Sequence, residues 1–333
     1  MSDIQTQFVK NILSGAETNR KETGLAFAPS NIALCKYWGK RHAALNLPLN
    51  SSLSISLGSL GTRTELRLRD GAAAAPAVFL NGELLPPDSS FAKRVAAFLD
   101  LFPMVGTSFE VRTENNIPTA AGLASSASGF AALTMALNDL AGWGLGGRML
   151  SMLARLGSGS ASRSVFDGFV QWHMGSNDDG SDSFAEPFSK PWPEFRIGIL
   201  ELTDAEKPVG SRDGMNRTVE TSALYANWPA QANADFQTLH SAILKRDFPT
   251  VGQTAEHNAL SMHATMMSAW PPLIYLQPES VAMIHQVRRV RADGLDVYLT
   301  IDAGPNIKLL FLEENEGAVA SAFPNIQVIN PFG

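Results

Sequence analysis

Residues 115–130 read NNIPTAAGLASSASGF and consist mainly of small side chains between a predicted strand and a predicted helix. Residues 109–113 alternate as a strand does, and the apolar positions from 132 to 140 recur as in a helix. A small-residue loop that opens a helix leaves backbone N–H groups free for an anion, and the helix dipole favours negative charge there. The run therefore predicts a phosphate site, and hydroxyls that can bond phosphate oxygens or magnesium come from Ser125, Ser126 and Ser128. Simple packing of a Ser/Ala-rich helix start is the alternative.

The composition is that of a globular protein long enough for two cores. The chain has 333 residues, of which 45% are hydrophobic and 17% are charged, and single cores stop growing near 250–300 residues, roughly. Its formal net charge of −6 argues against a general nucleic-acid binder, which would carry a basic face. A single cysteine, Cys35, excludes an internal disulfide. Neither a signal peptide nor a membrane-spanning run is recognisable, so we expect a cytoplasmic protein with no membrane contact.

A cluster of cations and aromatics lies between residues 28 and 41. Lys36, Lys40 and Arg41 fall close together and flank Tyr37 and Trp38. An exposed charged loop is the ordinary explanation of such a run. Aromatics beside cations, however, shape a pocket for a rigid polyanion rather than an open surface. We therefore interpret the segment as part of a polyanion site.

A second loop of small residues, 157–164, reads GSGSASRS. Its glycines give backbone freedom, its serines give donors and acceptors, and Arg163 carries a bidentate fork that suits a carboxylate. A flexible linker would use Gly and Ser in the same way. A linker would not usually carry a lone arginine followed at once by the turn and buried strand predicted at 165–172, so the loop predicts a binding site.

Two further features are ambiguous from the residues alone. Asp302 follows the strand predicted from residue 295 and precedes Ala-Gly-Pro-Asn, where an aspartate usually caps the turn. Lys93 or Arg94, on the helix predicted after the hairpin, can reach a nucleotide or phosphate, although a solvated helix face is the more ordinary explanation.

The sequence pattern also predicts most of the secondary structure. It indicates a polar helix at 8–22, strands at 47–57 and 62–70, and a hairpin around Asn81-Gly82. A domain boundary is expected near 187–193, followed by a buried strand at 195–200. Later helices are expected at 212–225, 232–246, 251–270 and 279–292. Strands that cluster early and helices that dominate later indicate an α+β arrangement.

Six segments together resemble one branch of a superfamily of small-molecule kinases. The superfamily contains galactokinase, homoserine kinase, mevalonate kinase and phosphomevalonate kinase, and the branch is diphosphomevalonate decarboxylase. The resemblance rests on PTAAGLASSASGFAAL (118–133), NIALCKYWGKR (31–41), LPLNSSLS (47–54), GSGSASRS (157–164), KPVGSRDGM (207–215) and DAGPN (302–306). Gly210 departs from the serine that is commoner in the family, which leaves the role of that position open.

The resemblance implies a role for each segment. Asp302 would accept or orient the proton of a 3-hydroxyl, Lys36 would lie near the reacting end, and Arg163 would hold the C1 carboxylate. The substrate would be bound by Tyr37, Trp38, Gly39, Lys40, Ser158, Gly159, Ser160, Ala161, Ser162, Arg163, Ser211, Arg212 and Met215. ATP would be bound by Gly122, Leu123, Ala124, Ser125, Ser126, Ser128, Lys93 and Lys207, with Mg²⁺ reached through ATP at Ser126.

The resemblance also implies a fold and a reaction. It implies an α+β, two-domain small-molecule-kinase fold, with a domain similar to ribosomal protein S5 domain 2 at 1–190 and a ferredoxin-like domain at 191–333. The implied activity is ATP- and Mg²⁺-dependent decarboxylation of (R)-5-diphosphomevalonate by a homodimer. A mevalonate 3-kinase or phosphomevalonate decarboxylase of the same superfamily is the nearer alternative, and a non-catalytic RNA-associated protein the remote one. We expect the segments to converge on one electropositive cleft whose only acidic residue is Asp302.

Overall fold

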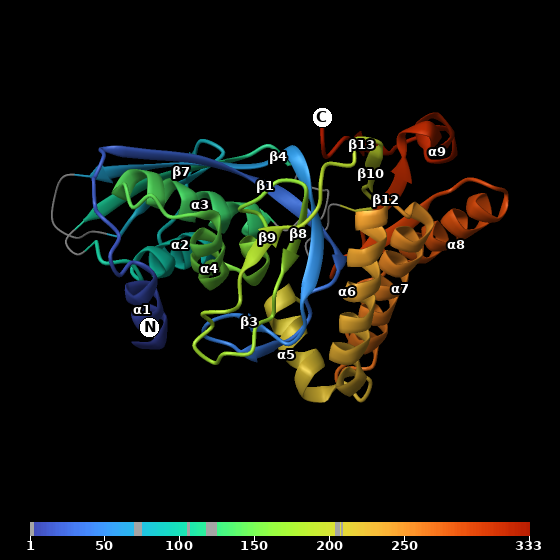
Figure 1. The fold of residues 1–333 in the computed structure, drawn as a ribbon, viewed down its shortest axis with the longest axis horizontal. Helices are drawn as coiled ribbons and strands as arrows, with labels where there is room; N and C mark the ends of the chain where they lie inside the picture. The colour runs from blue at the N-terminus through green and yellow to red at the C-terminus, as the bar shows by residue number, and fades with distance from the viewer. Residues whose placement is uncertain (1–2, 70–74, 105–106, 118–124, 204–206, 208) are drawn as a thin grey trace.

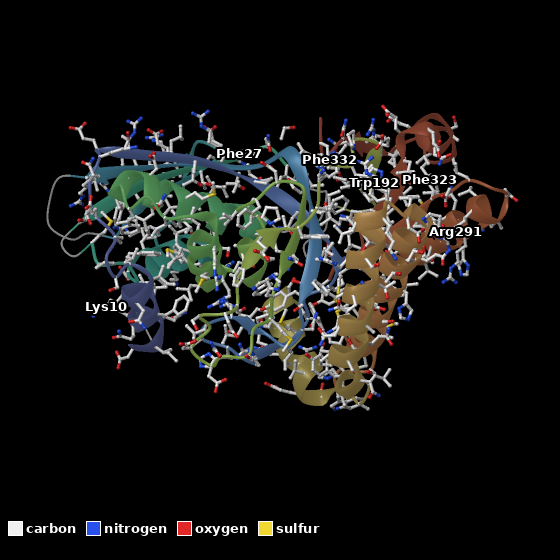
Figure 2. All side chains as sticks on the ribbon, viewed as in Figure 1. Lys10, Phe27, Trp192, Arg291, Phe323 and Phe332 are labelled. Atoms are coloured by element: carbon white, nitrogen blue, oxygen red, sulfur yellow. The ribbon has the colours of Figure 1, made fainter. Side chains whose placement is uncertain are left out.

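The computed structural model describes residues 3–69, 75–104, 107–117, 125–203, 207 and 209–333. Two parts lie side by side in it, a large sheet backed by helices α1 to α4 and a smaller sheet packed against the long helices α6 and α7 (Figure 1). Lys10 on α1 and Arg291 on α8 lie toward opposite sides of the molecule (Figure 2).

The large sheet is built on β4 (Ser52–Arg69), which pairs antiparallel with β1 (Thr23–Cys35) and β7 (Ser108–Asn115). Its strand order is β6-β5-β7-β4-β8-β9, with β1 also paired to β4. The other strands of this part are β5 (Ala77–Leu80), β6 (Glu83–Leu84), β8 (Phe169–Trp172), β9 (Ala185–Pro187) and the separate pair β2 (Lys40–His42) and β3 (Leu47–Pro48). Its helices are α1 (Asp3–Ile12), α2 (Ser90–Leu99), α3 (Ser125–Ala141), α4 (Gly147–Gly157) and the short η1 (Gly159–Ser162).

Some sequence predictions for this part are confirmed and two are wrong. The hairpin forms between β5 and β6, and both Asn81 and Gly82 take the positive φ that its tight turn requires. The helix predicted at 8–22 instead spans Asp3–Ile12, and Gly15 follows it with a φ of +84°. The strands predicted at 47–57 and 62–70 are largely one strand, because β4 continues through Gly58 at a φ of +59°.

The smaller part begins with β10 (Phe195–Leu200), the buried strand predicted there. Its sheet has the order β11-β12-β10-β13, all antiparallel, with β11 (Tyr298–Ile301), β12 (Ile307–Leu312) and β13 (Gln327–Ile329). Helices separate β10 from β11, and α9 (Glu316–Ala322) separates β12 from β13. This β-α-β-β-α-β order is the ferredoxin-like arrangement that was predicted for the second half of the chain.

The helices between β10 and β11 lie within a few residues of their predicted bounds. They are α5 (Ser211–Thr221), η2 (Tyr225–Asn227), α6 (Trp228–Lys245), α7 (Phe248–Met267) and α8 (Pro278–Ala292), and the short η3 (Glu313–Asn315) precedes α9. Among the described residues, none of the helices combines the length and the hydropathy that a bilayer crossing requires.

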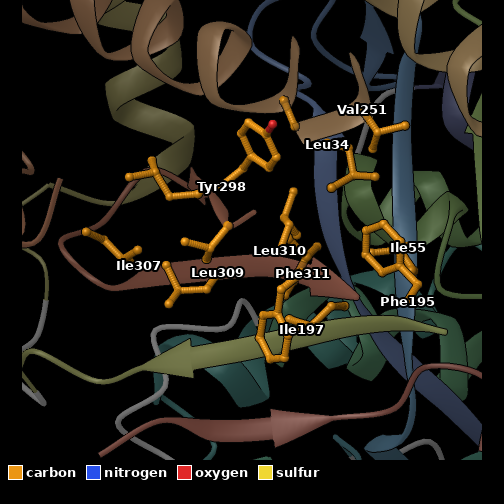
Figure 3. Packing of buried hydrophobic residues seen from close by; sticks show 14 of the residues in the cluster. Leu34, Ile55, Phe195, Ile197, Val251, Tyr298, Ile307, Leu309, Leu310 and Phe311 are labelled. Carbon is orange, nitrogen blue, oxygen red and sulfur yellow. The ribbon is translucent and has the colours of Figure 1, made fainter. Parts of the chain in front are cut away.

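One apolar core joins the two parts. Side chains of the small sheet, such as Leu309 and Phe311, pack with Val251 of α7 and with Leu34 and Ile55 from the large sheet (Figure 3). Burial of so many apolar groups stabilises the junction, at about 25 cal/mol per Å² of apolar surface removed from water. Because β1 ends inside this core, the residue that follows it is delivered to the interface between the parts.

Candidate active site

A cavity of about 570 Å³ lies at this interface and is lined from both parts of the chain. The large-sheet part contributes the segment after β1 and the loop after α4, while the small-sheet part contributes Lys207, the start of α5 and the turn that follows β11. We call it the interdomain cavity. Elements far apart in sequence therefore meet at one solvent-accessible site.

Asp302 is held in this cavity by lysines. Its Oδ1 accepts a hydrogen bond from Nζ of Lys36 at 2.8 Å, and Nζ of Lys308 lies 3.6 Å from its Oδ2. Burial alone would raise the pKa of Asp302, but the charges of Lys36, Lys308 and Lys207 outweigh burial and hold that pKa well below its usual range. The carboxylate is thus ionised at neutral pH, with about a third (32%) of its side chain still exposed.

Lys36 is fixed at the end of β1 by contacts from three segments. Its Nζ also donates to the carbonyl of Ala33 at 2.7 Å, and its backbone N–H donates to Oδ1 of Asn258 on α7 at 2.7 Å. Asn258 in turn donates to Asp235 of α6 at 2.8 Å. Burial lowers the pKa of Lys36, while the charge of Asp302 opposes that change. The ammonium group is therefore positioned by the protein before any ligand binds.

His263 of α7 supports the turn that carries Asp302. Its Nε2 lies 3.0 Å from the backbone carbonyl of Asp302, which can only accept, so Nε2 carries the proton. Burial is the main cause that lowers the pKa of His263 to about 4. The ring is consequently neutral at physiological pH and acts as a hydrogen-bond donor rather than as a cation.

A group of cations, Lys40, Arg94 and Arg212, lines one side of the cavity. Within the described part of the chain, none of them lies within ion-pair distance of a carboxylate. Burial, followed by the charges of Arg212 and Arg94, lowers the pKa of Lys40 to about 8. Cations that repel one another without a counter-ion form a site for a polyanion. We call this group the cation cluster.

The loop after α4 faces the cation cluster with hydroxyls and a guanidinium group. The Oγ atoms of Ser158 and Ser160 lie 3.3 Å apart on the cavity wall. Between them, Gly159 packs so closely on Tyr37 that a Cβ there would lie 2.6 Å from the ring. Only glycine fits this position, which explains the small residue in the predicted motif.

Arg163, near the end of this loop, is buried and only 2% exposed. Its Nη1 donates to Oγ of Ser52 at 2.5 Å and its Nη2 lies 3.5 Å from Oδ1 of Asn31, while its Nε has no partner among the described residues. Burial lowers the pKa of Arg163 to about 10, so the group remains a cation at neutral pH. A buried guanidinium with spare donors suits an incoming carboxylate.

Most of the other predicted residues that the structure describes lie on the cavity wall or directly behind it. On the cavity wall lie Trp38, Ser126, Lys207, Ser211 and Met215. Gly39, Ala161 and Ser162 lie behind the wall. Gly39, with a φ of +113°, sits where a Cβ would collide with Tyr225, and Ser162 donates to the carbonyl of Gly159 at 2.8 Å. These residues shape the wall without lining it.

The structure does not bring every predicted nucleotide residue to the cavity. Ser128 is buried and its hydroxyl lies 2.7 Å from that of Thr62, and Lys93 is exposed and absent from the wall, where Arg94 stands instead. Gly122, Leu123 and Ala124 lie outside the described residues, and of Ser125 only its place at the start of α3 is described.

Two charged groups of the site, one on the cavity wall and one beside Asp302, were not predicted from the sequence. Asp213, in the first turn of α5, also lines the cavity, so the expectation that Asp302 would be its only acidic residue is wrong. Lys308 was not singled out, although a lone lysine inside the apolar run at 307–312 was a usable signal.

Together the fold and the site define a class of protein: a two-domain protein of the small-molecule-kinase fold, with a polyanion cavity between an α+β domain and a ferredoxin-like domain. Residues 28–185 match the diphosphomevalonate decarboxylase-like N-terminal domain, and residues 197–330 match the mevalonate 5-diphosphate decarboxylase C-terminal domain. The chain belongs to the diphosphomevalonate decarboxylase family.

Individual relatives agree with that assignment. The diphosphomevalonate decarboxylase of Aspergillus fumigatus is 39% identical over 322 residues, which cover 90% of this chain and 79% of the fungal one. The mevalonate diphosphate decarboxylase of Staphylococcus aureus has a crystal structure that matches with a TM-score of 0.87 at 35% identity, covering 93% of this chain and 95% of that one. The protein MDDEF, in complex with MVAPP, AMPPCP and magnesium, matches with a TM-score of 0.84 at 41% identity, covering 92% and 95%. The predicted family and two-domain α+β fold are confirmed.

Proposed function

We propose that this protein catalyses the ATP-dependent decarboxylation of (R)-5-diphosphomevalonate to isopentenyl diphosphate, with release of ADP, phosphate and CO2. The observation that carries the proposal is the Asp302 carboxylate, ion-paired to Lys36 in a cavity that also holds the cation cluster and Arg163. Such a site can bind several anions and still direct one negative oxygen at an alcohol. The family assignment supports the same reaction.

The residues on the wall also fit ATP and Mg²⁺. The side chain of Lys207 lies against Gly304: a Cβ built on that glycine would be 3.4 Å from Cε of the lysine. Ser126 presents a small hydroxyl side chain at the start of α3. Within the described residues, no group of acidic, histidine or cysteine side chains could hold a metal on its own. We therefore propose that Mg²⁺ is held jointly with the triphosphate near Ser126. ATP would supply the phosphoryl group that turns the 3-hydroxyl into a leaving group.

Each part of the cavity has a task in this reaction. The cation cluster and the hydroxyls of Ser158, Ser160 and Ser211 would bind the diphosphate. The fork of Arg163 would hold the C1 carboxylate and align its bond to C2 for cleavage. Lys36 would stabilise the charge on the transferring group and on the departing phosphate.

Asp302 would orient the 3-hydroxyl. A carboxylate whose pKa is held low is a weak base, so we propose that it takes the proton only as the new bond between oxygen and phosphorus forms. The subsequent loss of CO2 expels phosphate and leaves the double bond. Asp302 needs no change of charge to set up the first step, because its lysine partners keep it ionised.

A coupled assay tests the proposal. It would record ADP and CO2 with mevalonate, its monophosphate and its diphosphate as substrates. Equal amounts of ADP and CO2 with the diphosphate alone are expected. ADP without CO2 would indicate a 3-kinase, turnover of the monophosphate would indicate a phosphomevalonate decarboxylase, and no ADP with any of them would contradict enzymatic activity of this kind.

Substrate binding should weaken in alkaline solution through Lys40. Because the pKa of Lys40 is about 8, the group is a cation below that pH and neutral above it. We expect KM for the diphosphate substrate to rise as pH increases through 8. In Lys40→Arg, which stays charged, the rise should disappear, whereas Lys40→Met should show a high KM at every pH. Measurement of KM between pH 6.5 and 9.5, roughly one and a half units on each side, would contradict this role if all three proteins shared one profile.

The family resemblance leads us to further proposals about the whole molecule. We propose a cytoplasmic homodimer that binds no nucleic acid, and the net charge of −6 supports the last point. A sedimentation mass of one chain would contradict the dimer.

We also propose a domain boundary near residue 190, between 1–190 and 191–333. The large sheet ends at β9 and the small sheet starts at β10, which supports that boundary.

A further inference from the structure

Lys308 is a lysine buried inside the small sheet. It lies on β12, is 1% exposed, and pairs in register with Ile199 of β10 and Thr300 of β11. Lysine is almost never fully buried without a partner, because removing an ammonium group from water is costly. The groups that its Nζ contacts therefore indicate why a lysine occupies this position.

The Nζ of Lys308 contacts the Asp302 turn. It lies 3.6 Å from Oδ2 of Asp302 and 3.4 Å from the carbonyl of Asn306, to which it donates. The other carboxylate oxygen, Oδ1, is held by Lys36. Two lysines from opposite parts of the chain thus hold the two oxygens of one carboxylate.

The two lysines differ in what else they can reach. Lys36 is among the residues that line the interdomain cavity, whereas Lys308 is absent from the cavity wall, although both side chains are only 2% exposed. In the proposed reaction the charge of Lys36 also serves the phosphoryl group. If Lys36 were the only partner of Asp302, the carboxylate would have to share its one counter-ion with that group.

We propose that Lys308 is the positioning residue of Asp302: it stays beside Oδ2, so that the carboxylate is negative and correctly oriented until it takes the proton, while Lys36 serves the phosphoryl group. This inference rests on the proposed function of the same site. The charge of Lys308 is also among the causes that lower the pKa of Asp302. The other titratable groups facing Asp302 cannot replace it, since they line the cavity or are neutral: Lys36, Lys207, Arg163 and His263.

Lys308→Met tests the proposal, because methionine has a similar length and no charge. We expect kcat to fall about tenfold or more, with both KM values unchanged, and the acid limb of the pH profile of kcat/KM to move to higher pH. Lys308→Arg should keep the limb near its original position. Lys245→Met, which removes an exposed charge at the end of α6, is the matched control and should behave as the parent.

A second measurement tests the pairing of Lys308 with Asp302 without relying on enzyme activity. The ¹³C signal of the Asp302 carboxyl, assigned with Asp302→Asn, should titrate at higher pH in Lys308→Met than in the parent, with the folded state checked by thermal unfolding. Each of three results for Lys308→Met would overturn the inference. The first is an unchanged kcat with an acid limb that superimposes on the parent's, and the second is a lower kcat with an acid limb that has not moved. The third is an Asp302 carboxyl that titrates at no higher pH than in the parent. If neither the parent nor any variant turns over the substrate, but the Asp302 carboxyl still titrates at higher pH in Lys308→Met, the pairing of Lys308 with Asp302 is supported and the proposed function is contradicted.

Discussion

Asp302→Asn is expected to lower kcat by ~10²–10⁴-fold, because the amide cannot accept the proton of the 3-hydroxyl. Lys36 and Lys308 both form ion pairs with this carboxylate, and about a third of the Asp302 side chain is exposed. ATP binds through other residues in the proposed site, so its dissociation constant should stay close to that of the parent. Steady-state kinetics and equilibrium nucleotide binding on the same preparations measure the two quantities.

Asp213→Asn is the matched comparison, since it removes the other acidic charge that lines the cavity. Asp213 lies beside Arg212 at the start of α5, next to the proposed diphosphate site. Its loss removes a charge that repels the substrate, so KM should fall or stay level while kcat changes little. Full turnover by a folded Asp302→Asn protein that still binds ATP would show that Asp302 is not the catalytic carboxylate.

The local features of the fold could be predicted from the sequence because their causes are local. Asn81-Gly82 specifies a tight turn by its own conformational preference, and the hairpin forms there. Residues 195–200 are apolar throughout and form the buried β10. The first helix was misplaced because Phe8 and Val9 mark its buried side without marking its ends, and the glycine at 15 stops it early.

The long strand β4 shows a limit of pattern analysis. Ser52, Ser54 and Ser56 are as fully buried as Leu53 and Ile55 between them. The apolar side chains enter the core shared with the small sheet, while Oγ of Ser52 accepts from Arg163 on the opposite face. A strand covered on both faces by different parts of the chain gives no simple alternation of inside and outside, so its extent could not be predicted from periodicity.

The convergence of the site could not be derived from spacing. Lys36, Arg163 and Asp302 are brought together by the core that joins the two sheets, and only the resemblance to a family predicted that they would meet. Arg94 and Lys93 show the same limit on a smaller scale. They are neighbours on one helix, and which of them faces the cavity depends on how α2 packs, which the sequence near them does not specify.

Arg163→Gln is expected to lower kcat/KM for diphosphomevalonate by about thirtyfold to several-thousandfold, because a buried charged partner of the substrate carboxylate is lost, at a cost of about 2–5 kcal/mol. The neutral amide cannot offer the two parallel donors of a guanidinium. CO2 release should suffer more than ADP formation, since the bond from the carboxylate to C2 is no longer aligned. The ratio of ADP to CO2, measured in one reaction, should therefore rise above the parent's.

Arg163→Lys separates charge from geometry at the same position. Lysine restores the positive charge in the loop after α4 but not the fork, so we expect partial recovery of binding with the ADP to CO2 ratio still raised. Ser52 and Asn31 lose their guanidinium partner in both variants, which makes the two comparable in packing. If ADP and CO2 instead fell in parallel and lysine restored both, Arg163 would act as a simple cation for substrate capture, and alignment of the carboxylate would have to come from another residue.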